Sequence, residues 1–89
     1  MKTIIVFDER SWKWFVDTDC TRAALESEFC YLESIYDYRG YLYLNKVYET
    51  LGLDWNPDNE NLCFRMENGP IEFDYELMED NTYKITITQ

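Results

Sequence analysis

The last third of the 89-residue chain alternates between apolar and polar side chains, which is the period of a β-strand with one buried face. Three such segments, residues 62–67, 71–77 and 83–88, predict a three-stranded antiparallel meander. Asn68-Gly69 predicts a hairpin turn between the first two segments, although Pro70 limits pairing directly after it. Because one face of this sheet is apolar, helices must cover it.

Helical spacing replaces this alternation in the middle of the chain. Leu25, Phe29, Leu32 and Tyr36 recur at i, i+4, i+7 and i+11, which predicts an amphipathic helix over about residues 21–36. The preceding acidic and hydroxyl side chains offer an N-cap, and a glycine at position 40 breaks the helix. The central segment therefore supplies one long helix that can cover the sheet.

Two further segments complete the predicted fold. A second helix is expected over residues 42–51, with Gly52 at the position of a C′ glycine. Residues 3–7 are apolar and β-branched, and residues 12–16 alternate after a turn, which together predict an N-terminal hairpin. The predicted order is ββααβββ, so we expect an α+β fold in a single domain, residues 1–89.

The net charge of the chain limits the classes of partner that we expect it to bind. Eighteen Asp and Glu residues face eight Lys and Arg residues and no His, which gives a net charge of −10. Such self-repulsion destabilises a folded domain, so we interpret the excess acid as functional. It repels nucleic acid and anionic membranes and attracts basic proteins. No apolar run approaches the ~20 residues of a membrane span, and we expect a cytoplasmic protein.

The residue types also limit the chemistry. Without His, a Ser-His or Cys-His nucleophile is excluded, and zinc loses its commonest ligand. Residues 54–60 are similar to a calcium loop, but Asn59 and Arg65 stand where that loop needs Gly and Glu, so we interpret the segment as a solvated acidic turn. We expect no enzyme, no cofactor and no metal. Paired carboxylates of a small hydrolase are a minor third alternative.

Acidic residues along the first helix are the strongest candidates for a functional surface. Glu26, Glu33 and Asp37 share one helical face and span roughly 16 Å, so their carboxylates can imitate a row of phosphates. Exposed tyrosines in the same stretch would grip Arg and Lys by cation–π contact. The predicted partner-binding residues are Glu26, Glu33, Asp37, Asp54, Asp58, Glu60, Tyr38 and Tyr41.

The predicted sheet carries a second acidic row that we expect to be mostly neutralised. A two-residue turn at 68–69 puts Arg65 opposite Glu72, and the next hairpin puts Lys84 opposite Glu76. Asp74 is then the least compensated acid of the row. We therefore expect the negative field to come from the helix and from the 54–60 loop.

Residues 39–53 carry the pattern R-G-Y-x-x-L-N-x-V-Y-x-x-L-G. This pattern resembles a stretch in small uncharacterised proteins of phages and integrative elements of Gram-positive bacteria. The resemblance implies a mobile-element origin, and the acidic, tyrosine-rich composition is similar to that of anti-CRISPR and DNA-mimic inhibitors. It implies no catalytic residue.

The resulting prediction is an acidic inhibitor that acts in the host cytoplasm. It would bind a basic nucleic-acid-binding protein, above all a CRISPR effector or another nuclease, and block its nucleic-acid site by charge mimicry and steric occlusion. We expect no direct contact with nucleic acid or membrane. The alternative is a structural or assembly protein of a mobile element that self-associates through an aromatic surface, and a homodimer fits either reading.

Overall fold

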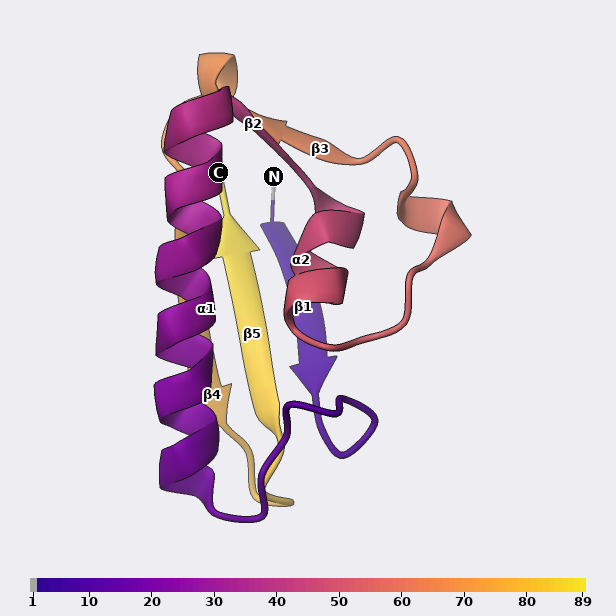
Figure 1. Ribbon diagram of the computed structural model, residues 1–89, viewed down its shortest axis with the longest axis vertical. Coiled ribbons are helices and arrows are strands. Elements are labelled where there is room, and N and C mark those ends of the chain that lie inside the picture. Colours follow the sequence, from indigo (N-terminus) through magenta and orange to yellow (C-terminus); the bar gives the residue numbers. More distant parts are fainter. Residues whose placement is uncertain (1) are drawn as a thin grey trace.

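Two helices lie on one face of a three-stranded sheet, while the other face of the sheet is uncovered (Figure 1). The structure, a computed structural model, describes residues 2–89. It confirms the α+β class. The helices are α1 (Thr18–Arg39) and α2 (Leu44–Thr50), and the strands are β1 (Lys2–Phe7), β2 (Tyr41–Tyr43), β3 (Cys63–Arg65), β4 (Glu72–Leu77) and β5 (Tyr83–Thr88).

The large sheet has the order β1-β5-β4, and both pairings are antiparallel. Ile85 in the central strand lies opposite Ile5 of β1 and Tyr75 of β4. The predicted hairpin register is confirmed, because Leu77 pairs with Tyr83 across the β4–β5 turn. The N-terminal and C-terminal strands are thus direct neighbours, and β1 and β4 are the two outer strands.

The predicted N-terminal hairpin is wrong. Residues 8–17 form a loop, and β1 pairs with β5 instead. The buried Ser11 hydroxyl donates a hydrogen bond to the Leu51 carbonyl, which ties this loop to the end of α2. Trp12 and Val16 are 79% and 84% exposed, so the alternation of residues 12–16 does not correspond to a buried face.

The predicted three-stranded meander is also wrong, because β3 belongs to a separate two-stranded sheet with β2. Leu42 lies opposite Phe64 there, and both side chains are buried in the core. Residues 66–68 form a 3₁₀ turn in place of a hairpin, and Gly69 follows in a conformation with φ of 105°. The first strand of the predicted meander, β3, therefore pairs with β2. The third strand of the large sheet is β1.

The helix α1 follows its sequence signals closely. All four residues of its predicted apolar stripe are buried. Asp17 is the N-cap, and its carboxylate accepts hydrogen bonds from the Asp19 and Cys20 amides at 2.8 and 3.2 Å. Gly40 ends the helix in the left-handed conformation, and its N–H donates to the Tyr36 carbonyl at 2.8 Å. These caps extend the helix by three residues beyond each predicted end.

The core lies between α1, α2 and the covered face of the sheet. Phe29 of α1 stacks on Phe73 of β4, with ring centroids 5.2 Å apart. Val47 and Leu51 bring the second helix into the same core. The helix α2 begins two residues later than predicted, since residues 41–43 form β2.

Two glycines with positive φ give a matched test of this fold. Gly40 and Gly52 have φ of 80° and 74°, but a Cβ on Gly40 would meet nothing within 4 Å, whereas on Gly52 it would lie 2.7 Å from the Ser11 Oγ. Gly40→Ala should lower the free energy of unfolding by about 1 kcal/mol, from backbone strain alone. Gly52→Ala should cost about 1–3 kcal/mol more, because it also disturbs the Ser11 contact. Urea unfolding measures both, and equal losses would contradict the loop placement.

Candidate partner-binding surfaces

The acidic stripe predicted on α1 lies on the flank of the helix that turns toward β4. Glu26, Glu33 and Asp37 are all exposed, and their spacing puts them on one side of the helix. The Tyr75 hydroxyl of β4 donates a hydrogen bond to the Glu26 carboxylate, which fixes the direction of this flank. That hydrogen bond is the largest cause of a raised pKa of the Tyr75 phenol, and desolvation adds to it.

The sheet adds a second group of acids on its uncovered face. Glu72, Asp74 and Glu76 alternate along β4 and are exposed. Glu76 lies opposite Lys84 as predicted, with the carboxylate and ammonium 3.9 Å apart. The predicted pairing of Glu72 with Arg65 is wrong, because Arg65 belongs to β3 in the other sheet. Both Glu72 and Asp74 face threonines on β5, so β4 keeps two uncompensated carboxylates.

These acids surround the free outer side of β4, and we name this surface the acidic edge. Within residues 2–89, none of its carboxylates forms an ion pair with a Lys or Arg side chain. The edge therefore projects uncompensated negative charge. Its members are Glu26, Glu33, Asp37, Glu72 and Asp74.

The second predicted acidic region lies on the opposite side of the molecule. Asp54, Asp58 and Glu60 belong to the segment between α2 and β3, which extends past β1, whereas α1 and β4 form the other side (Figure 1). The Asn45 side chain holds this segment, since its amide nitrogen donates to the Asn56 carbonyl at 3.0 Å and its oxygen accepts the Asn56 N–H at 3.1 Å. One flat partner surface cannot contact both acidic regions.

The two tyrosines of the predicted binding surface lie on different elements. Tyr38 is 90% exposed on α1, but Tyr41 is 37% exposed on β2, where its ring meets that of Tyr43 with centroids 5.7 Å apart. The Lys46 ammonium lies 5.9 Å from the centroid of the Tyr31 ring. The rings of Tyr31, Tyr41 and Tyr43 thus gather beside a cation, on the flank of α1 that faces α2. Helical spacing alone does not reveal this grouping, because β2 and α2 contribute most of it.

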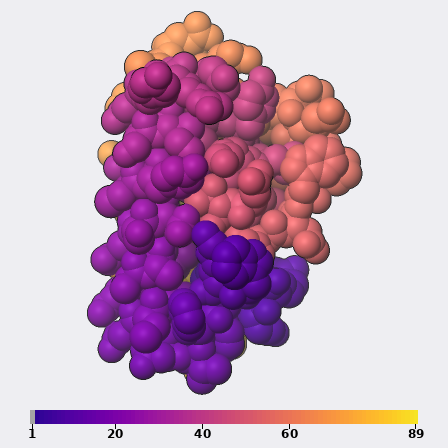
Figure 2. Space-filling model, in the orientation of Figure 1, coloured from indigo at the N-terminus to yellow at the C-terminus, as the bar shows by residue number. Residues whose placement is uncertain are grey.

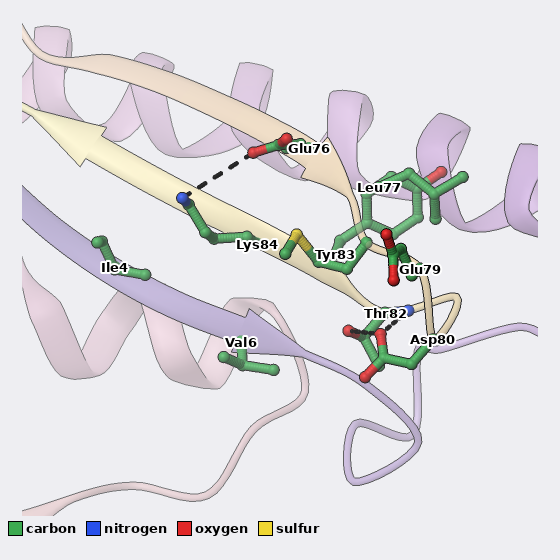
Figure 3. Close-up of a pocket in the computed structure, with 10 residues that line it drawn as sticks. Ile4, Val6, Glu76, Leu77, Glu79, Asp80, Thr82, Tyr83 and Lys84 are labelled. Atoms are coloured by element: carbon green, nitrogen blue, oxygen red, sulfur yellow. Dashed lines mark hydrogen bonds and ion pairs between the residues drawn. The ribbon is translucent and has the colours of Figure 1, made fainter.

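A hollow of about 640 Å³ lies on the uncovered sheet face beside the β4–β5 turn (Figure 3). The Asp80 carboxylate accepts hydrogen bonds from the Thr82 hydroxyl at 2.6 Å and the Thr82 N–H at 3.1 Å, and these bonds lower the pKa of Asp80. Glu76 of β4 and Lys84 of β5 point toward one another at the border of the hollow (Figure 3). These charged groups therefore have partners inside it. The apolar side chains that line the hollow are Ile4, Val6, Leu77 and Met78.

The part of the chain that the structure describes contains no candidate metal site. Within residues 2–89, no three Cys, Asp or Glu side chains come close enough together to hold a metal ion. The three cysteines, Cys20, Cys30 and Cys63, are unpaired as thiols.

No family model, curated protein or solved structure matches this chain. The resemblance carried by residues 39–53 therefore stays a prediction. Among the described residues, no helix combines the length and the hydrophobicity that a membrane span requires.

The hydrogen bond between Tyr75 and Glu26 gives a direct test of the acidic edge. In the wild type the pKa of the Tyr75 phenol lies above its ordinary value of 10.0. Because folding raises this pKa, the hydrogen bond stabilises the folded state fully at pH values below the ordinary pKa of Tyr75. This contribution is lost as the pH rises through the raised pKa. Glu26→Gln should lower the pKa of Tyr75 toward 10.0, measured by NMR titration of the ring.

The matched control for this titration is Glu33→Gln, which removes a charge from the same flank without a contact to Tyr75. This variant should leave the Tyr75 titration nearly unchanged. An equal effect of both substitutions would show that the flank does not turn toward β4 as described.

Proposed function

We propose that this chain is an acidic inhibitor of phage or mobile-element origin. It binds the basic nucleic-acid site of a host defence protein, above all a CRISPR effector, and excludes nucleic acid by charge mimicry and steric occlusion. The observation that carries the proposal is the acidic edge, where carboxylates of α1 on one face of the sheet and of β4 on the other flank the outer strand without an ion-pair partner within residues 2–89. Its action is binding rather than catalysis.

The spacing of the carboxylates supports mimicry of phosphates. Glu72 and Asp74 are two residues apart on one face of a strand, which separates them by about 7 Å. Glu33 and Asp37 are one helical turn apart, which is about 6 Å. Two phosphate steps along one DNA strand cover about 7 Å of helix axis. Lysines and arginines that are placed to contact phosphates can therefore meet carboxylates at a comparable repeat.

The absence of ion-pair partners for these acids within residues 2–89 matters for the energetics of binding. An acid that is already in an ion pair must give up that partner before it binds another cation, whereas the acids of the edge have none to lose. The net charge of −10 also extends the attraction beyond direct contact. Such a field speeds association with a basic surface and weakens as salt is added.

A second candidate is a structural or assembly protein that self-associates through an aromatic surface. The observation in its favour is the loop between β1 and α1, where Trp12, Phe15 and Val16 are all at least half exposed. Large apolar side chains on a surface are enriched at protein interfaces. Sedimentation separates the two candidates, because this one requires a homo-oligomer that ignores nucleic-acid-binding proteins.

The proposed function is tested by two charge-reversal variants of equal charge. One carries Glu33→Lys, Asp37→Lys and Glu72→Lys on the acidic edge, and its control carries the same change at Asp54, Asp58 and Glu60. Binding to a panel of purified CRISPR effectors and restriction nucleases is measured by surface plasmon resonance over a salt series. The edge variant should associate about tenfold to a hundredfold more slowly with the bound nuclease.

The control variant should retain most of the wild-type association rate, because its substitutions lie on the other side of the molecule. Equal losses in the two variants would show that only the net charge matters. A complex that is insensitive to salt, or a panel without any binder, would contradict the proposed function.

A further inference from the structure

A second pocket lies on the opposite flank of α1 from the acidic edge. It has a volume of about 260 Å³ and is formed by α1, β2 and α2, on the face where the two helices lie side by side (Figure 2). The half-buried Ile35 and the fully buried Leu42 give it an apolar floor. Its walls are the rings of Tyr31, Tyr41 and Tyr43, each of which is partly exposed.

The charged groups of this pocket are cations. Arg39 and Lys46 both line it, and they are two of the eight cations of the chain. Within residues 2–89, the Arg39 guanidinium has no ion pair and donates no hydrogen bond. The Lys46 ammonium lies over the Tyr31 ring and 3.9 Å from the carboxylate of the exposed Glu49. The pocket is thus locally positive in a strongly acidic chain.

The acids elsewhere do not cancel this local charge. The acidic edge lies across the body of α1, which is about 10–12 Å wide, and charges in water are screened over about 8 Å at physiological salt. On the near side, Glu28 is already paired with Lys13 at 3.2 Å. Glu49 is the acid that contacts Lys46, and this contact is long and exposed. An anion can therefore replace Glu49 at little cost.

We propose that this pocket binds an aromatic ring that carries a phosphate group. Tyrosine rings offer stacking and edge contacts to a flat ring. An unpaired guanidinium beside an ammonium suits a phosphate, which carries close to two negative charges at pH 7 and accepts paired hydrogen bonds from Arg. The pocket is smaller than most cofactor sites, so one ring with its phosphate fits it better than a dinucleotide does. This site is independent of the acidic edge, which attracts cations.

The test is an NMR titration of the full chain with phenyl phosphate, followed through the backbone amides. Saturable shifts should appear in residues 39–46. Inorganic phosphate and phenol, which each supply half of the ligand, should bind at least about tenfold more weakly. Parallel titrations with 5′-AMP and with phosphotyrosine identify the source of the ring, and tighter binding of either one supports the proposal. The absence of saturable shifts from phenyl phosphate up to about 10 mM would overturn it.

Two arginines of α1 supply the matched variants. Arg39→Gln should weaken phenyl phosphate binding at least about tenfold, whereas Arg22→Gln, which changes a cation paired with Asp19 at 3.2 Å, should leave it unchanged. Thermal melts establish that each variant is folded, and Lys46→Gln replaces Arg39→Gln if the latter is not. Equal binding by the pocket variant and the Arg22 variant would overturn the proposal, as would inorganic phosphate that binds as tightly as phenyl phosphate.

Discussion

The packing of α1 against β4 and β5 is the interaction on which the rest of the structure depends. Leu25 and Leu32 are almost completely buried in the same core as Ile85 and Ile87 of β5, and each such leucine contributes about 1.5–3 kcal/mol of apolar burial. Because the apolar stripe can face only the sheet, the rotation of the helix is fixed. One flank then turns its acids toward β4, and the other turns Tyr31 and Arg39 toward β2 and α2. The two proposed sites of opposite charge follow from this single constraint.

Much of the fold could be predicted where the controlling interactions are local in sequence. The stripe of α1, its Asp17 cap and its Gly40 end depend on residues within a few turns of one another. The β4–β5 register also followed from a short turn, with Glu76 opposite Lys84. The pairing of β1 with β5 could not be predicted in this way, because it joins segments about 80 residues apart. The alternation of residues 12–16 was misleading for the same reason, since no partner strand is available to them.

The candidate site, too, could be predicted only where its residues are close in sequence. The sequence placed Glu26, Glu33 and Asp37 on one flank, which is what the helix shows. Their relation to the 54–60 loop and to the tyrosines depended on tertiary structure, which places the loop on the other side of the molecule. Because Arg65 was predicted to neutralise Glu72, the sequence did not indicate that Glu72 belongs to the acidic edge.

In both proposals, α1 separates a negative flank from a positive pocket. Amide relaxation in the presence of cationic and anionic nitroxides measures the electrostatic potential near each residue directly. We expect that the cationic probe acts most strongly at residues 33, 37, 72 and 74, and that the anionic probe is least excluded at residues 39–46. A uniformly negative potential over both flanks would contradict it.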